Sequence, residues 1–192
     1  MGRYEDSAAA FQRALQLQPT APTYTNLGIT YAYSGKFAEA VPMFEKSVAL
    51  GPNAETWVGN LGDGYRWLGQ TEKAAATYDK AIALALKDLQ VNPRNAVATG
   101  HLAMYYAKKS DNARALKLIA DARAVDRANV ELIYIEALVH VLGGRTPEAL
   151  SALEGAIAAG YPATMVQNDP DLKALAGDPR FKTLSSKSAA TR

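Results

Sequence analysis

Cysteine is absent from this chain of 192 residues, which excludes disulfide bonds and thiolate metal sites and leaves the cellular compartment open. An excess of one charge is lacking too. The net charge is +2, with basic and acidic residues interspersed, so the chain has no electrostatic footprint for nucleic acid. No apolar run reaches the roughly 20 residues that a membrane-spanning helix needs, and residues 1–10 do not read as a signal peptide. We therefore expect neither a nucleic-acid partner nor membrane insertion.

Motifs for chemistry are missing as well. The glycines between residues 28 and 36 have the wrong spacing for a phosphate-binding loop, and Phe37 stands where Ser or Thr would hold magnesium. The chain has no Gly-x-Ser-x-Gly, no His-Glu-x-x-His and no Asp-rich calcium loop. We therefore predict that the protein is not an enzyme and uses no cofactor or metal. A third possible function, after the two given at the end of this section, is an enzyme or small-molecule receptor with a site under the C-terminal residues.

The chain does contain a spacing that recurs about every 34 residues. Each unit has a glycine-like position, a large apolar residue nine positions later and a small residue twelve positions later. The glycine-like positions are Gly2, Gly35, Gly69, Ser110 and Gly144. The large residues are Phe11, Phe44, Tyr78, Ile119 and Leu153. The small residues are Ala14, Ser47, Ala81, Ala122 and Ala156, and a further small residue follows each glycine-like position by five. A period near 34 residues indicates a helical repeat array, which usually binds a partner.

The unit at residues 21–53 explains the spacing physically. Its first half has a stripe at the i, i+3, i+4, i+7 spacing of one helix face, made by Tyr24, Leu27, Gly28 and Tyr31. Gly35 then permits the left-handed conformation that ends a helix. The second stripe consists of Phe37, Ala40, Phe44, Ser47 and Val48, and Pro52 stops that helix. Each unit is therefore predicted to be a helical hairpin, which buries its apolar face only by stacking on others.

These residues resemble the tetratricopeptide (TPR) repeat, whose pattern places aromatic residues, Leu-Gly, Tyr, Gly, Ala and Pro at fixed positions. In the first full unit the matching residues are Tyr24, Leu27, Gly28, Tyr31, Gly35, Phe37, Ala40, Phe44 and Pro52. In the second they are Leu61, Gly62, Tyr65, Gly69, Ala74, Tyr78 and Ala81. The resemblance covers residues 2 to 160 and implies an all-α fold, a right-handed α-solenoid of about four and a half TPR helical hairpins.

We expect a TPR array over residues 1–160 and a short helical capping tail over 161–192. The array would consist of an orphan helix at 2–18 and hairpins at 21–52, 54–92, 95–127 and 129–159. The orphan helix has the pattern of a second helix. We interpret the sequence as a segment of a longer protein; the alternative is that this helix caps the next hairpin unaided. The longer helix from about Thr71 to Gln90 is either a docking surface or a tolerated insertion.

The tail contains two Asp-Pro pairs, and Asp-Pro suits the start of a short helix. Its Gly-Tyr-Pro, Asp-Pro-Asp-Leu and Asp-Pro-Arg-Phe motifs look like the C-terminal ends of TPR regions in bacterial multidomain kinases, winged-helix regulators and nucleotide cyclases. The preceding helix is apolar nearly all round, through Tyr134, Ile135, Leu138, Val141 and Leu142. We hypothesise that either the tail, residues 161–184, or a partner covers part of this surface.

Binding residues are expected on the side of each first helix that faces away from the hairpin core. The predicted partner-binding residues are Asn26, Ile29, Tyr33, Asn60, Asp63, Arg66, Trp67, His101, Met104 and Lys108. Tyr33 and Trp67 should be neighbours, and aromatic rings beside Asn amides suit extended peptides. The alternative is that Trp67 packs over its own loop or along the stem of Arg66.

Two further groups of residues bear on other kinds of site. Some TPR proteins hold chaperone C-termini with a clamp of five residues, and the five positions here are Thr25, Ile29, Asn60, Val97 and His101, of which only Asn60 matches. We therefore do not predict this clamp. Glu136 and His140 lie one turn apart on a core-facing stripe. They could form a catalytic or metal site, but a buried, hydrogen-bonded polar pair is the interpretation we favour.

The predicted function is a docking module that binds a peptide or protein of unknown identity on its concave surface, within a larger bacterial protein. The location expected is cytoplasmic, or periplasmic if the parent protein is membrane-anchored. The alternative function is self-assembly, in which the open N-terminal helix stacks on another copy to give a homo-oligomer.

Overall fold

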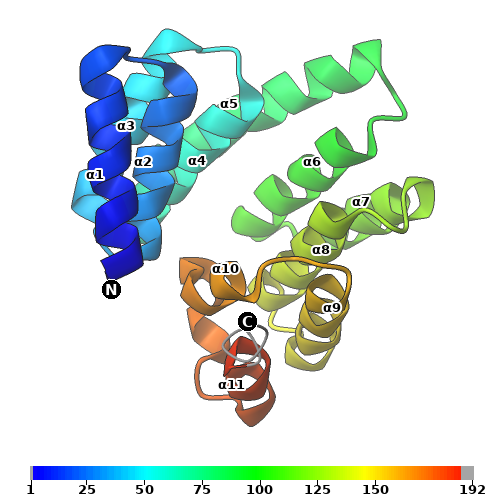
Figure 1. Ribbon diagram of the computed structural model, residues 1–192. Coiled ribbons are helices and arrows are strands. Elements are labelled where there is room, and N and C mark those ends of the chain that lie inside the picture. The colour runs from blue at the N-terminus through cyan, green and yellow to red at the C-terminus, as the bar shows by residue number, and fades with distance from the viewer. Residues whose placement is uncertain (1, 187–192) are drawn as a thin grey trace. The chain divides into compact units, whose positions relative to one another are not determined.

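The computed structural model describes residues 2–186, and the regular elements in that range are all helices, with no strand among them. The helices are labelled in Figure 1. The chain divides into two compact units, Met1–Leu84 and Ala85–Arg192, and one helix, α5 (Thr71–Val91), belongs to both. The expected all-α fold is confirmed. None of the described helices combines the length and the apolar character needed to cross a bilayer.

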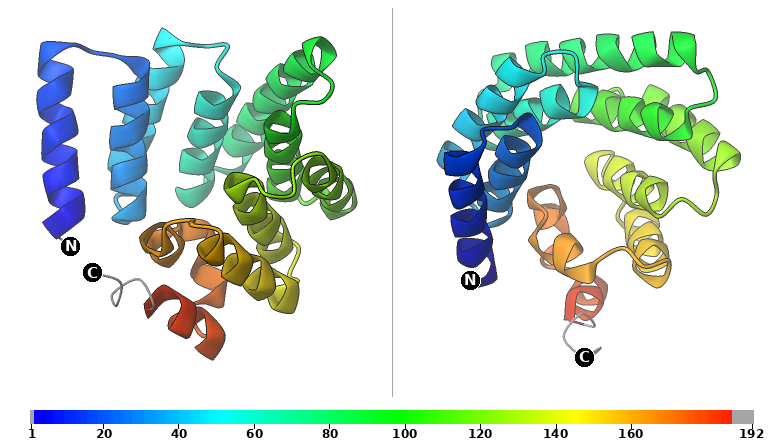
Figure 2. Two further views of the ribbon diagram at one scale, coloured as in Figure 1. Left: turned by 45° about the vertical axis from the view of Figure 1, so that its right-hand side comes forward. Right: turned by 45° about the horizontal axis from the view of Figure 1, so that its top comes forward.

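The first unit consists of one helix followed by helices that pack in pairs. Its elements are α1 (Gly2–Leu17), α2 (Ala21–Tyr33), α3 (Phe37–Leu50), α4 (Glu55–Trp67) and the first part of α5. Helix α1 packs on α2, α2 packs on α3, and α3 packs on α4, so these helices lie side by side (Figure 2). Helix α1 falls within the range 2–18, and α2 and α3 fall within the range 21–52.

A residue with left-handed backbone closes the turn of each hairpin. Gly35, Gly69 and Gly144 have φ angles of +79°, +72° and +71°, and Ser110 has a φ of +64° at the equivalent turn. The backbone N–H of Lys36 donates to the carbonyl oxygen of Tyr31 at 2.8 Å and so satisfies the end of α2. The glycine-like position of the repeat is thus a helix C-terminal turn, and a Cβ at Ser110 costs about 1–2 kcal/mol there.

The large and small residues of the repeat form the inner contact of each hairpin. In the second helices of the complete hairpins these residues are at most 3% exposed, and they include Ala40, Phe44, Ser47, Ala74, Tyr78, Ala81, Ala115, Ile119, Ala122, Ala149, Leu153 and Ala156. A Cβ on Gly28 would lie 2.5 Å from the Phe44 ring, and a Cβ on Gly62 would lie 2.6 Å from the Tyr78 ring. Only glycine lets the two helices of these hairpins approach so closely.

The second unit contains two further hairpins and the tail. Its elements after α5 are α6 (Ala96–Lys108), α7 (Asn112–Val125), α8 (Val130–Leu142), α9 (Thr146–Ala158), α10 (Ala163–Asn168), the 3-10 helix η1 (Pro170–Leu175) and α11 (Pro179–Ser186). Helix α6 pairs with α7, and α8 pairs with α9. The long helix that was predicted to end at about Gln90 ends at Val91. The last residues of the predicted tail, 187–192, lie outside the described range.

The tail packs against the apolar face of α8. Helix η1 contacts α8, and α11 contacts α9 and α10. One buried cluster joins Val166, Leu172, Leu175, Phe181 and Leu184 of the tail to Leu138, Leu150 and Leu153 of the last hairpin. Of the two covers considered for the apolar face of α8, the tail is therefore the one present in this chain. The tail therefore explains why α8 can be apolar nearly all round.

Candidate partner-binding surfaces

The predicted binding residues of the first unit come from α2 and α4, which contact each other. Asn26 is exposed on α2. The other five that remain accessible are half-buried: Ile29, Tyr33, Asn60, Arg66 and Trp67. We call these six residues the α2/α4 surface. It offers amide, aromatic and guanidinium groups, which suit contact with a polypeptide backbone and its side chains.

Asp63 has a different environment, because it is only 7% exposed. The hydroxyl of Tyr78 donates to Asp63 Oδ1 at 2.6 Å, and Arg66 Nε donates to the Tyr78 hydroxyl at 3.2 Å. Burial raises the pKa of Tyr78, so its hydroxyl stays a donor. The Asp63 carboxylate therefore joins α4 to α5. The sequence did contain a sign of this contact. Tyr78 occupies the large-residue position of the repeat, which holds Phe in the two preceding units, and a buried phenol hydroxyl needs a hydrogen-bond partner.

Removing the Tyr78 hydroxyl tests the role of Asp63. Because Tyr78→Phe takes a donor from a buried carboxylate, we expect the free energy of unfolding to fall by about 1–3 kcal/mol. The matched control is Tyr65→Phe, which removes an exposed hydrogen bond of 2.8 Å to Glu45 and should cost much less. Urea unfolding followed by tryptophan fluorescence measures both, because Trp57 and Trp67 are the only tryptophans and belong to the first unit. Equal losses would contradict a structural role for Asp63.

Trp67 packs on the preceding hairpin while remaining partly accessible. Its ring centroid lies 5.6 Å from that of Phe37 in α3, with the planes tilted by 31°. The guanidinium of Arg66 lies 6.0 Å from the Trp67 ring. The alternative from the sequence was packing along the stem of Arg66, and the guanidinium of that residue is the part recorded near the ring. The contact with Phe37 was not predicted, because the repeat pattern does not say which neighbouring ring a residue at this position meets. Trp67 therefore also stabilises the stacking of two hairpins.

The predicted residues of α6 are engaged within the second unit. His101 Nε2 and Glu131 Oε1, at the start of α8, lie 3.2 Å apart, and this hydrogen bond lowers the pKa of Glu131. Lys108 Nζ lies 3.8 Å from Asp171 Oδ2 of the tail, and their side chains are only 2% and 3% exposed. Met104 packs against the buried cluster beneath the tail. The sequence period gave no sign of the ion pair with Asp171, because the tail lies outside the repeat.

A second tail carboxylate lies beside this ion pair. Asp169 accepts a hydrogen bond from the Tyr134 hydroxyl and another, at 2.7 Å, from the backbone N–H of Asp171. The Tyr134 and Tyr161 rings stack with centroids 4.0 Å apart. Burial, and then the charge of Asp171, raises the pKa of Asp169 to about 6, against the opposing effects of Tyr134 and Lys108. Two acidic groups thus share one buried lysine.

The raised pKa of Asp169 predicts a pH dependence with a definite sign. The folded protein holds the proton more tightly than the unfolded chain, whose pKa is near 3.8, so stability falls as pH rises from about 4 to about 6. The full shift corresponds to about 3 kcal/mol. Asp169→Asn keeps the acceptor for Asp171 and should remove this contribution, so the variant should be more stable than the wild type at pH 7 and similar at pH 4. Calorimetry across this range measures the difference; identical pH profiles would contradict the assignment.

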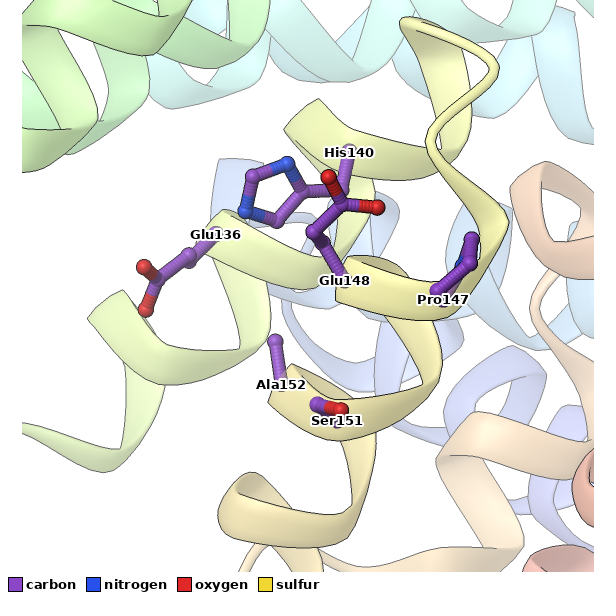
Figure 3. Close-up of a pocket in the computed structure, with 6 residues that line it drawn as sticks. All are labelled: Glu136, His140, Pro147, Glu148, Ser151 and Ala152. Atoms are coloured by element: carbon purple, nitrogen blue, oxygen red, sulfur yellow. The ribbon is translucent and has the colours of Figure 1, made fainter.

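Glu136 and His140 do not form the predicted pair with each other. Arg123 Nε donates to Glu136 Oε2 at 3.1 Å, and Nδ1 of His140 is buried without a hydrogen-bond partner. The two residues line a groove between α8 and α9 together with Pro147, Glu148, Ser151 and Ala152 (Figure 3). Arg145 from the preceding turn holds Glu148 at 2.7 Å. The favoured interpretation was wrong because an arginine of α7 reaches Glu136.

The ionisable side chains that line this groove differ in how they are held. Burial lowers the pKa of His140, so the imidazole is neutral at neutral pH. Both glutamates are held by arginines. Among the residues that the structure describes, no three His, Asp or Glu side chains come together in a way that could hold a metal ion.

Two curated proteins are similar to part of this chain. The chain is 33% identical over 84 residues to the Hsp70-Hsp90 organizing protein of Triticum aestivum, which is 43% of this chain and 14% of that protein. It is 34% identical over 85 residues to anaphase-promoting complex subunit 6 of Arabidopsis thaliana, 41% of this chain and 16% of that protein. The chain thus spans only a small part of the curated relatives that it matches.

One solved structure shows the same fold over nearly the whole chain. A thermophilic TPR protein of Thermus thermophilus superposes with a TM-score of 0.60 and 20% identity, covering 99% of this chain and 92% of that one. Three models of the tetratricopeptide repeat family match residues 1–53, 56–91 and 101–163, which together make up most of the sequence. The chain therefore belongs to the tetratricopeptide repeat family.

Proposed function

We propose that this chain is a protein–protein interaction module that binds an extended peptide, or such a segment of a protein, on the α2/α4 surface. One observation supports this site above the others. The predicted binding residues on α2 and α4 stay accessible apart from Asp63, whereas Lys108 and Met104 lie against the tail and His101 is paired with Glu131. More of the predicted binding residues are therefore accessible in the first unit than in the second.

The chemistry of the α2/α4 surface suits a polypeptide backbone. The amides of Asn26 and Asn60 each supply donors and an acceptor, which is what an extended peptide requires. The rings of Tyr33 and Trp67 offer apolar area next to these amides. Asp63 is left out of the proposed contact set, because its carboxylate is buried against Tyr78.

Removal of both amides tests the proposal. Binding partners captured on the wild-type chain are identified, and one of them is purified for titration by calorimetry against Asn26→Ala/Asn60→Ala. Two lost hydrogen bonds at about 0.5–1.5 kcal/mol each should weaken binding by roughly tenfold or more. The control is Asn53→Ala/Asn92→Ala, the same change at two exposed asparagines outside the helices. Equal affinities for the two double variants would place the partner elsewhere.

A chaperone tail is not the partner that we propose. The wheat relative is named for Hsp70 and Hsp90, but only Asn60 of the five clamp positions matches here, and the others are Thr25, Ile29, Val97 and His101. Thr25 is moreover buried, and its hydroxyl forms a hydrogen bond of 2.6 Å with the hydroxyl of Ser47. A peptide ending in a free carboxylate should bind no better than its C-terminal amide.

We also propose that the module works inside a larger bacterial protein, as a docking part beside other domains. The support is the resemblance of the tail motifs around Tyr161, Asp169 and Asp178 to the ends of TPR regions in bacterial kinases, winged-helix regulators and cyclases. The gene sequence on both sides of this chain tests the idea. A reading frame that encodes nothing beyond these residues would contradict it.

A further inference from the structure

The described part of the tail, residues 161–186, lies on the side of the second unit where partner contacts were expected. Met104 and Lys108 of α6 are predicted partner-binding residues. Met104 packs against the buried cluster that includes Leu172 of η1. Lys108 Nζ lies 3.8 Å from Asp171 Oδ2, also of η1. Leu138 holds in α8 the repeat position that Met104 holds in α6, and it belongs to the same cluster. The tail therefore covers the same side of both first helices.

Polar side chains hold the tail on this side. The side chains of Lys108 and Asp171 are only 2% and 3% exposed. The Tyr134 hydroxyl of α8 donates to Asp169, and Leu172, directly after Asp171, is 1% exposed. A buried ion pair adds little stability compared with packed apolar groups, but an unpaired charge in the same place is costly. The contact therefore selects a carboxylate followed directly by leucine. The residues that receive this segment are Met104, Lys108, Tyr134 and Leu138, which we call the α6/α8 face.

The tail is built as a part that can separate from the hairpins. Its helices α10, η1 and α11 are 6, 6 and 8 residues long. Helices shorter than about 12 residues are not stable alone in water, so these depend on the surface that they cover. Gly160, between α9 and the tail, has a φ of +101°, and a Cβ there would meet nothing within 4 Å. The backbone at Gly160 can therefore turn without a side-chain clash while α9 stays in its hairpin.

We propose that the tail is an intramolecular ligand of the second unit, which occupies the α6/α8 face through Asp169–Leu172 and closes that face to other peptides. The occupant is the chain's own acidic segment, so Lys108 recognises a carboxylate and the cluster around Leu138 receives the leucine that follows it. This autoinhibitory contact goes beyond the proposed function, which concerns the α2/α4 surface of the first unit. Either can fail without the other.

Reversal of one charge in the full chain should release the tail. Asp171→Lys places a second cation against the buried Lys108, so the segment can no longer occupy the α6/α8 face. We expect amide hydrogen exchange in α8 to become tenfold faster or more, while α6 and α7 keep their protection. The matched control is Ala174→Lys, which adds the same charge at an exposed position of η1 and should leave exchange in α8 unchanged.

The released face should then accept the same segment from solution. The probe is a synthetic peptide of residues 161–186 labelled with fluorescein, and its anisotropy measures binding. It should bind the Asp171→Lys chain saturably and restore slow exchange in α8. The wild-type chain should bind it at least tenfold more weakly, because the attached tail competes at a high effective concentration. A peptide that carries Asp171→Asn lacks the carboxylate for Lys108 and should also bind at least tenfold more weakly than the unchanged peptide.

Four results would overturn the proposal. Equal binding of the peptide to the wild-type and Asp171→Lys chains would place its site elsewhere, and no binding to the Asp171→Lys chain would show that the face does not accept a separate segment. If α6 and α7 lost protection in Asp171→Lys and also in the milder Asp171→Asn chain, the tail would be an integral part of the fold. Sedimentation that showed wild-type dimers lost in Asp171→Lys would make the tail of a second copy the occupant.

Discussion

Phe44→Ala should lower the free energy of unfolding of the first unit by about 3–5 kcal/mol, the usual cost of removing a fully buried phenyl ring. Phe44 is 1% exposed, and its ring fills the space between Gly28 of α2 and Gly64 of α4. Neither glycine has a side chain that could move into the cavity. A loss of this size is a large part of the roughly 5–15 kcal/mol that stabilises a typical domain.

The matched control for this variant is Phe37→Ala. Phe37 is the same residue type seven positions earlier in α3, but it is only half-buried, so its removal should cost clearly less. Urea unfolding followed by the fluorescence of Trp57 and Trp67 reports on the first unit. Because Phe37 also touches Trp67, the comparison uses unfolding midpoints and slopes rather than the absolute signal. If both variants lost the same stability, Phe44 would not be the central contact of its hairpin.

Lys108→Met should destabilise the packing of the tail on α8 by about 3–5 kcal/mol, because it leaves a buried carboxylate without its cation. The side chains of Lys108 and Asp171 are almost wholly buried, and Asp169 lies beside them. Without the lysine, the two acidic groups repel each other in a place that water does not reach. The tail should then detach more often. Faster amide exchange in α8 and η1, and binding of a hydrophobic dye to the apolar face of α8, measure this.

Two further variants separate charge from packing. Lys109→Met makes the same change at the exposed neighbouring residue and should alter exchange little. Lys108→Met/Asp171→Leu replaces the whole pair by apolar side chains and should recover much of the loss, since a buried ion pair can often be exchanged for packed apolar groups. The role of the ion pair would be contradicted if the double variant were as unstable as Lys108→Met. It would also be contradicted if Lys109→Met raised amide exchange as much as Lys108→Met does.

Regular features of the chain could be predicted because each depends on nearby residues. The left-handed turn at Gly35 follows from glycine at the end of a helical stripe. The burial of Phe44 follows from the period of the repeat. The end of α5 came within one residue of its predicted place, because an insertion of about two helical turns keeps the apolar residues on one face.

Pairings of polar side chains could not be predicted in the same way. Glu136 and His140 lie one turn apart, which suggested a pair, but Arg123 of the neighbouring helix holds Glu136. Spacing along one helix says which residues share a face and not which side chain of another helix reaches them. Asp63 was expected on a binding face for the same reason, yet it lies within hydrogen-bond distance of Tyr78 in α5.

The amino-acid sequence alone determined the type of fold, the hairpin turns and the slots that pack inside each hairpin, because a repeat of about 34 residues fixes local helix geometry over and over. Only the tertiary structure decided which surfaces remain accessible. The tail shows the difference, since its motifs predicted short helices, whereas the contact of Asp171 with Lys108 depends on where those helices pack. Burial and charge pairing depend on contacts between residues that are distant in the chain, and the spacing of residues within one helix does not say which of those contacts form.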